Sequence, residues 1–281
     1  MRLQRLLAGV SLQAPKPRAA LAAAEIAALA HAELEVMTVL ASPWELVHAD
    51  EVEGLRRAHL GSPAEVAAER ACERLQQLVA PAVLSAPRVS YGAAFGWPSV
   101  ELVRRAEETS ADLIVLWRPG QGAIGPAEDV TPATLRRSRV PVLIAPPVHE
   151  VYQRVLACVD DSPRAALVLD AATTLGECMG VETVALHVES AAAGIVPAGG
   201  RRPWLSRLEA ITGGGTALAL ETAVRQGDVV SAILSEASTG PDALVVFGYH
   251  RGMNYGAAGA VTTVAARLLR RATSALLAVP I

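Results

Sequence analysis

A glycine-rich segment carries the strongest chemical signal in this sequence of 281 residues. Glycines at 248, 252, 256 and 259 precede Thr262 and Thr263, where a helix is predicted to begin. Glycines let backbone N–H groups approach an anion closely, the amino terminus of a helix adds partial positive charge, and a threonine hydroxyl can bond a phosphate oxygen. The segment therefore predicts a phosphate-binding loop. The alternative is that a tight connection between a strand and a helix needs glycine for structural reasons alone.

Asp160 is the second candidate, because it follows an apolar run at 154–159 that is typical of a buried strand. A carboxylate there could accept a hydrogen bond from a ribose hydroxyl or hold the water of a metal ion. His187 and His250 lie near the same predicted edge and could act as a base or ligand, although a structural role is favoured for both. The sequence has no nucleophile elbow, HExxH or Walker A spacing, so no catalytic residue is expected.

The sequence repeats itself, and the repeat defines the elements that must position these residues. RLLAGV at 5–10 matches RVLACV at 154–159, and LRRSRVPVLIAP at 135–146 matches LRRATSALLAVP at 269–280. The offset between the halves changes only between such landmarks, which indicates that one fold occurs twice. We therefore predict one domain over 1–147 and a second over 151–281, with paired prolines at 146 and 147 between them.

Strands alternate with helices in each half, which predicts an open parallel sheet with helices on both faces. We expect two flavodoxin-like, Rossmann-like α/β domains, each with five strands in the order 3-2-1-4-5. Ser162 and Pro163 are predicted to begin a helix as its N-cap and first residue. The predicted strands are 5–10, 34–40, 87–91, 113–117, 140–145, 154–159, 183–188, 216–223, 243–247 and 275–279, and the predicted helices are 18–31, 64–79, 99–109, 132–138, 163–179, 204–211, 229–238 and 263–271. Ligands bind such sheets at the carboxyl ends of the strands, where strand order reverses.

Composition excludes several classes of protein. Hydrophobic residues make up 52% of the chain and charged residues 19%, which is ample apolar material for buried cores. The net charge of -3 and the dispersed basic residues give no footprint for nucleic acid. Three cysteines without a CxxC pair suggest a reducing compartment and no metal site. The sequence shows neither a signal-peptide pattern nor the ~18 apolar residues of a membrane span, so we expect a cytoplasmic protein.

Four segments of the second half follow a known family pattern. They are VLACVDDS at 155–162, VRQGD at 224–228, ALVVFGYHRG at 243–252 and RLLRRATSALLAVP at 267–280. This half resembles the universal stress protein family, and the first half is similar through RAAL at 18–21, ADLIVLW at 111–117 and LRRSRVPVLIAPP at 135–147. The resemblance implies a tandem member with two such domains. In that family a strand-end aspartate and a Gly-x2-Gly-x9-Gly-Ser/Thr loop bind ATP, while some members lack the loop and bind no nucleotide.

Carried over residue by residue, the resemblance implies a partial nucleotide site in the second half. Asp160 matches the family aspartate, Gly248 the first loop glycine and Thr263 the final Ser/Thr. Arg251 stands where the second glycine is expected, and Thr262 stands where the third should be. The candidate binding residues are Asp160, Val188, Gly248, Gly252, Thr262 and Thr263. The implied ligand is ATP or another adenine nucleotide, with or without Mg²⁺, and no metal is expected to be held by protein side chains alone.

The first half departs further from the family motif. Ser11 replaces the aspartate, Trp117 replaces the first glycine, and Glu128 and Asp129 fall near the expected phosphate position, although Gly120 and Gly122 survive. Two carboxylates there would repel a triphosphate. We therefore predict that the first half does not bind ATP in the family manner.

Residues 41–86 contain an insertion, because the stretch before Gly96 has 18 more residues than its counterpart in the second half. Much of the surplus is a polar-flanked predicted helix at 45–74. Two interpretations are open, a lid over a site and a longer surface helix.

Three hypotheses for function follow. The leading one is a cytoplasmic stress-response regulator that binds an adenine nucleotide as a conformational signal and is not an enzyme, with slow ATP hydrolysis at most. The second is a scaffold of the same fold that binds no nucleotide and acts through protein contacts. The third, an enzyme of another α/β family, lacks a catalytic cluster. The resemblance also implies pairing through the last strand of each half, as an intramolecular pseudo-dimer, a homodimer or both.

Overall fold

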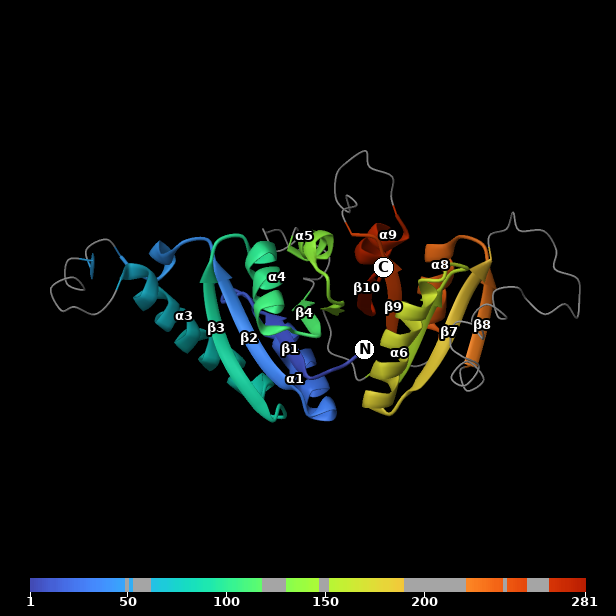
Figure 1. The fold of residues 1–281 in the computed structure, drawn as a ribbon, viewed down its shortest axis with the longest axis horizontal. Coiled ribbons are helices and arrows are strands. Elements are labelled where there is room, and N and C mark those ends of the chain that lie inside the picture. Colours follow the sequence, from blue (N-terminus) through green and yellow to red (C-terminus); the bar gives the residue numbers. More distant parts are fainter. Residues whose placement is uncertain are drawn as a thin grey trace, which may run out of the picture. The chain divides into compact units, whose positions relative to one another are not determined.

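The computed structural model describes residues 1–48, 51–52, 62–117, 130–146, 152–189, 221–239, 242–251 and 263–281. The chain divides into two compact units (Figure 1). One unit comprises Arg2–His149, and the other comprises Glu150–Ile281 together with Met1.

The first unit contains a parallel sheet whose five strands follow the order β3-β2-β1-β4-β5. The strands are β1 (Arg5–Gly9), β2 (Glu33–Leu40), β3 (Arg88–Phe95), β4 (Leu113–Trp117) and β5 (Val142–Ala145). The helices are α1 (Arg18–Ala30), α3 (Pro63–Val79), α4 (Pro98–Thr109) and α5 (Val130–Arg137), with short 3-10 helices η1 (Pro43–Glu45) and η2 (Ala80–Ala82). Right-handed crossovers place α1 and α3 on one face of this sheet and α4 and α5 on the other.

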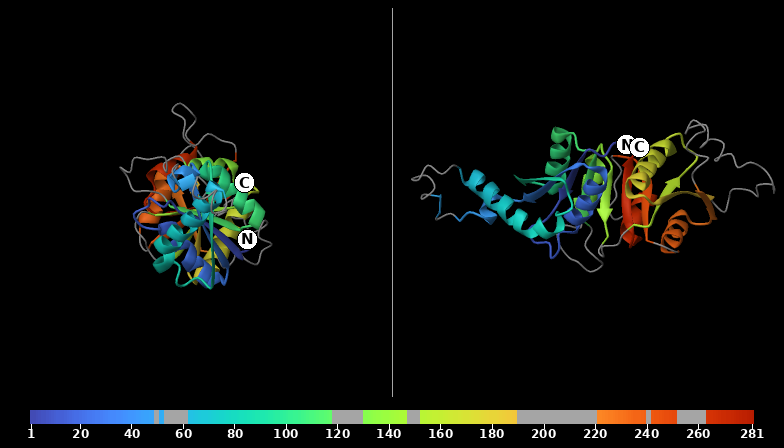
Figure 2. Two further views of the ribbon diagram at one scale, coloured as in Figure 1. Left: turned by 90° about the vertical axis from the view of Figure 1, so that its left-hand side faces the viewer. Right: turned by 90° about the horizontal axis from the view of Figure 1, so that it is seen from below.

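The second unit has the same sheet order, β8-β7-β6-β9-β10. Its strands are β6 (Arg154–Val159), β7 (Glu182–Glu189), β8 (Glu221–Gln226), β9 (Ala243–Tyr249) and β10 (Ala275–Pro280). Its helices are α6 (Ala165–Met179), α8 (Val229–Ser238) and α9 (Val264–Arg271). Helix α6 covers one face, and α8 and α9 cover the other (Figure 2). The predicted fold class, with the strand order 3-2-1-4-5 in each half, is confirmed.

Most predicted boundaries differ from the observed ones by a few residues, among them the starts of β8 and α6 in the second unit. Strand β8 begins at Glu221, later than the predicted start at 216, and residues 216–220 and the predicted helix at 204–211 lie outside the described residues. Helix α6 begins at Ala165, so Ser162 is not its N-cap. The reason is a tight turn before the helix, in which the Ser162 N–H donates to Asp160 Oδ1 at 3.0 Å and the Ala165 N–H donates to the Ser162 carbonyl at 3.1 Å.

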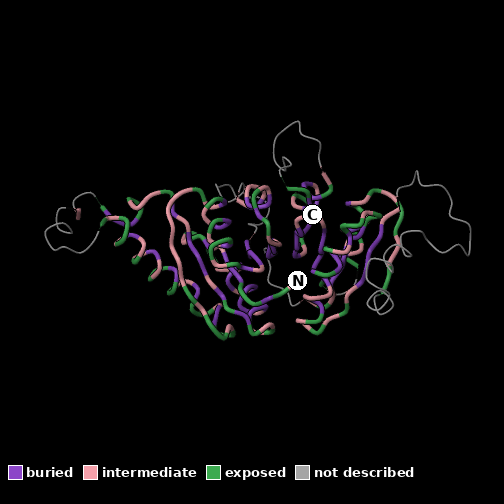
Figure 3. The backbone as a smooth tube through the Cα atoms, viewed as in Figure 1, coloured by how far each residue is buried: buried purple, intermediate pink, exposed green. Residues whose placement is uncertain are grey.

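The cores lie between each sheet and its helices (Figure 3). Strands β4 and β9 lie inside their sheets and are almost completely buried, since residues 113–116 of β4 and 243–247 of β9 are all buried. This burial on both faces explains why these strands are continuous apolar runs rather than alternating ones. No helix in the described part of the chain combines the length and hydrophobicity that crossing a bilayer requires.

Helix α3 shows how the insertion is built into the first unit. It buries Ala67, Ala71, Leu75 and Val79, which are spaced four residues apart and therefore share one face of the helix. A capping box fixes its start, because Ser62 Oγ accepts from the Glu65 N–H at 3.3 Å and Glu65 Oε2 accepts from the Ser62 N–H at 2.6 Å.

Ser62→Ala is expected to lower the free energy of unfolding by about 1 kcal/mol, because one helical N–H loses its partner. The Ser62 backbone N–H and then its hydroxyl lower the pKa of the Glu65 carboxyl. The contribution of this carboxylate is therefore present above the ordinary glutamate pKa and lost as the pH falls through the lowered value. Urea denaturation measures the change, with exposed Ser85→Ala as the control. Equal midpoints for the two variants would contradict the assignment of the cap.

Candidate functional site

The strand register of the second unit brings three of the predicted site residues to one edge of the sheet. Strand β6 is central, with β7 on one side and β9 on the other. Val159 at the end of β6 pairs with His187, and Cys158 pairs with Phe247. Asp160 therefore follows β6 at the level of Val188 on β7 and close to Gly248 on β9.

This edge is also the point where strand order reverses. The chain leaves β6 toward α6 on one face of the sheet, and it leaves β9 toward α9 on the other face. The two connections diverge, which is the arrangement that opens a ligand crevice in parallel α/β sheets. Asp160 lies in the first of these connections.

Asp160 is exposed, and its side chain is oriented by the turn that precedes α6. Its Oδ1 atom accepts a hydrogen bond from the Ser162 N–H at 3.0 Å. Among the residues that the structure describes, Oδ2 has no hydrogen-bond partner. The geometry therefore offers one fixed carboxylate oxygen and one that a ligand hydroxyl can reach.

Gly248 is required by packing. A Cβ atom on Gly248 would lie 2.9 Å from Ile281 Cδ1 and 3.3 Å from Val168 Cγ2, closer than side chains normally approach. Strand β9 is thus covered at this point by side chains of the same unit. The close contacts therefore support a structural reason for glycine at position 248, which was the alternative to anion binding.

Thr263 is the N-cap of α9. Its hydroxyl accepts from the Ala266 N–H at 3.2 Å, so the helix begins at Val264, one residue after the predicted start at 263. Gly252 and Thr262 lie outside the described residues.

His187 has the structural role that the sequence favoured. Its side chain is 7% exposed, and Nδ1 lies 3.0 Å from the Val159 carbonyl oxygen. Because a carbonyl only accepts, Nδ1 carries the proton in this contact. The ring thereby joins the carboxyl ends of β6 and β7, beside Asp160.

An ion pair that the sequence analysis missed holds α9 against α8. Arg267 donates to both carboxylate oxygens of Asp228, at 2.9 and 2.7 Å, and Asp228 Oδ1 also accepts from the N–H and hydroxyl of Ser231 at the start of α8. Bonding to Arg267, then to Ser231, holds the pKa of the Asp228 carboxyl well below its usual range. Gly227 before it has φ +119°, a conformation that favours glycine. The Gly-Asp pair at the end of VRQGD was the sequence signal that could have predicted this turn and helix start.

An apolar cluster lies in the first unit between the end of β2, the residues after η1 and helix α3. Its buried members are Leu40, Leu46, Val47, Ala67 and Ala71, hereafter the first-unit cluster. Leu12, from the connection after β1, packs against it, and Arg70 of α3 donates to the Leu46 carbonyl at 2.8 Å. The insertion therefore packs one face of α3 near the carboxyl end of β2 and the connection after β1. The predicted positions 120, 122, 128 and 129 lie outside the described residues.

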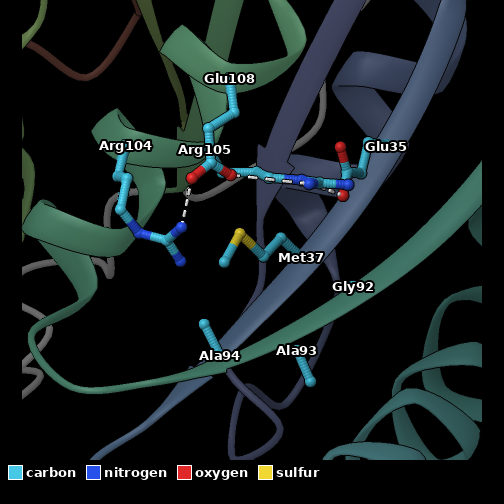
Figure 4. Close-up of a pocket in the computed structure, with 8 residues that line it drawn as sticks. All are labelled: Glu35, Met37, Gly92, Ala93, Ala94, Arg104, Arg105 and Glu108. Carbon is cyan, nitrogen blue, oxygen red and sulfur yellow. Dashed lines mark hydrogen bonds and ion pairs between the residues drawn. The ribbon is translucent and has the colours of Figure 1, made fainter.

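A hollow of about 250 Å³ lies elsewhere on the first unit, against β2, β3 and α4 (Figure 4). Small residues form its floor, and its charged side chains bond one another rather than facing it unpaired. Arg105 Nε donates to Glu35 Oε1 at 2.8 Å, and Arg104 bonds Glu101 and Glu108. The hollow is lined by Glu35, Met37, Gly92, Ala93, Ala94, Arg104, Arg105 and Glu108. None of the predicted site residues contributes to it.

Other chemistry is sparse in the described part of the chain. No group of three or more His, Cys, Asp or Glu residues there could hold a metal ion. Burial raises the pKa of the Cys158 thiol to about 12, so this thiol is protonated at neutral pH.

Comparison with known proteins gives a family and a fold. The model of the universal stress protein family matches residues 2–146, the half that departs further from the nucleotide motif. No curated protein matches the chain. A universal stress protein from Archaeoglobus fulgidus has a similar structure, with a TM-score of 0.61, 17% identity and 98% of each chain covered.

Two further structures extend the comparison. A putative universal stress protein from Pseudomonas aeruginosa aligns with a TM-score of 0.61 at 13% identity, over 99% of this chain and 93% of its own. The cytoplasmic domain of a prokaryotic cation chloride cotransporter aligns with a TM-score of 0.50 at 12% identity, over 98% of this chain and 95% of its own. At these identities the likeness concerns the fold, which proteins of different function share.

Proposed function

The chain belongs to the universal stress protein family, and from that premise we propose that its second unit binds an adenine nucleotide as a conformational signal in a cytoplasmic stress response. The proposal includes a tandem arrangement, with a second domain of the same family over 151–281. The strand order common to the two units supports that part of it.

Asp160 is the observation that carries the proposal. Its exposed carboxylate lies where strand order reverses, between the ends of β7 and β9, with Oδ1 fixed by the Ser162 N–H. A carboxylate in this position can accept from a ribose hydroxyl of a nucleotide bound at the edge of the sheet. The ligand would be ATP or another adenine nucleotide, with or without Mg²⁺.

The role proposed is that of a sensor. The described residues of this edge supply a carboxylate and a helix amino terminus, and they supply no paired nucleophile and base that would speed a chemical step. We therefore expect ATP hydrolysis to be slow at most. Association through the last strand of each half remains a prediction, which light scattering of the full chain would test.

The first unit is expected to bind no nucleotide. Ser11 stands in place of the aspartate, and Leu12 beside it packs against the first-unit cluster. Binding to the full chain should therefore saturate at one nucleotide per molecule.

Asp160→Ala is expected to weaken ATP binding by at least about 10-fold, because a hydrogen bond to a charged group is worth about 1.5 to 3 kcal/mol. Isothermal titration of the full chain with ATP, with and without Mg²⁺, measures affinity and stoichiometry. Asp161→Ala is the matched control, since Asp161 is the neighbouring exposed aspartate and should leave the affinity unchanged. The absence of any heat or thermal shift at millimolar ATP would contradict nucleotide binding.

A scaffold without nucleotide is the second candidate, favoured by a specific observation. Two tryptophans are exposed where β2 and β3 of the first unit end, Trp44 to 56% and Trp97 to 80%. Aromatic side chains are enriched in the surfaces through which proteins contact one another. The titration above separates the two functions, because only the first requires binding.

A further inference from the structure

An arginine at the edge of the second unit has an unusual partner. Arg164 Nη1 lies 3.3 Å from His250 Nδ1. Arg164 directly precedes α6, and His250 directly follows β9. The contact therefore joins the two connections that diverge where strand order reverses, at the edge of the sheet that Asp160 follows.

The packing below this contact explains why Arg164 reaches the edge. Val168, one helical turn after Arg164, packs against Gly248. His250 is two residues beyond Gly248, so the strand alternation directs both toward the same face. Val168 and Ile281 close the space at Gly248, and the Arg164 guanidinium lies one turn beyond them, at the exposed rim.

A guanidinium bonds an oxyanion more strongly than it bonds an imidazole nitrogen. Arg–carboxylate and Arg–phosphate pairs form two parallel, charge-assisted hydrogen bonds of about 2.7 to 2.9 Å. Arg267 of the same unit does this with Asp228, at 2.9 and 2.7 Å. In the described part of the chain, Arg164 makes one longer contact to a ring nitrogen, so an anion bound at this edge would be the better partner for it.

We propose that Arg164 binds the phosphate of a nucleotide whose ribose is held by Asp160, leaving His250 when the ligand is present. The inference rests on the proposed function and names the part of the ligand that this edge recognises. Asp160 and Arg164 come from the same turn before α6, four residues apart, so one short segment supplies an acceptor for the sugar and a cation for the phosphate. Arg164 thereby takes the place of the glycines that the loop lacks relative to the family motif.

The test compares ATP with adenosine, which shares the base and sugar and lacks the phosphates. The unaltered full chain should bind ATP about 10-fold or more tightly than adenosine. Arg164→Gln should lower ATP affinity by about 10-fold and leave adenosine affinity unchanged, and Arg164→Lys should retain an intermediate affinity for ATP. Arg270→Gln, at an exposed arginine on α9, is the matched control and should bind both ligands as the unaltered chain does.

The outcomes separate this inference from the proposed function. If the unaltered chain binds ATP and Arg164→Gln binds it equally well, the phosphate role is overturned while nucleotide binding stands. An equal loss of ATP and adenosine in Arg164→Gln also overturns it, since that result would mean a role in the structure of the turn. If the unaltered chain binds neither ligand, both proposals fail.

Discussion

Val47→Asp should destabilise the first unit by about 3 kcal/mol or more, because it places a carboxylate among apolar side chains. Val47 is 0% exposed and belongs to the first-unit cluster with Leu40, Leu46, Ala67 and Ala71. An ionised carboxylate there would have no compensating charge within the cluster. Urea denaturation followed by far-UV circular dichroism measures the loss of stability.

Trp44→Asp is the matched control, because it introduces the same side chain in the same segment at a position that is 56% exposed. It should change the free energy of unfolding by no more than about 0.5 kcal/mol. Small and equal effects of the two substitutions would contradict the role of Val47 in the first-unit cluster.

The fold was predictable because its signals are local. The runs at 113–117 and 154–159 are apolar throughout, and each coincides with an observed strand. The internal sequence repeat then predicted that the two halves have the same order of strands and helices, and the structure shows the same strand order in both units. Gly180 after α6 has φ +66°, the left-handed conformation that a glycine at the end of a helix provides.

The first-unit cluster was not predictable in the same way. It joins residues that lie apart in the sequence, with Leu40 at the end of β2, Val47 after η1 and Ala71 on α3. No periodic sequence pattern links such positions. The polar residues around Val47 are typical of a surface segment, so the sequence did not predict that Val47 is buried. The sequence therefore left both interpretations of the insertion open, and the structure shows that one face of α3 belongs to the core of the first unit.

The position of a candidate site residue was predictable where that residue follows a strand directly. Asp160 was placed correctly at the end of β6, since the strand before it was evident. Two contacts in the same unit were not predicted, one between Arg164 and His250 and one between Arg267 and Asp228. The residues of each pair lie far apart in the sequence and meet only because helices pack on the sheet. The prediction that Ser162 is the N-cap of α6 was wrong, because Ser162 lies in a turn before the helix, where its N–H donates to the Asp160 carboxylate.

Gly248→Val is expected to lower the free energy of unfolding by about 1 to 3 kcal/mol, the usual cost of overpacking a filled site. The new Cβ atom would lie 2.9 Å from Ile281 Cδ1 and 3.3 Å from Val168 Cγ2 before the two methyl groups are added. Thermal and urea denaturation measure the loss, with Ile281→Ala alone as the reference for a small cavity.

The double variant Gly248→Val with Ile281→Ala separates packing from ligand binding at this glycine. Ile281→Ala removes the two atoms that lie closest to the new side chain, Cδ1 at 2.9 Å and Cγ2 at 3.2 Å. If Gly248 serves packing, the double variant should recover most of the lost stability and bind ATP as the unaltered chain does. If Gly248 instead allows a nucleotide to approach the backbone of β9, the double variant should be stable and yet fail to bind. We expect the first result, because Val168 and Ile281 already occupy the space that an approaching ligand would need.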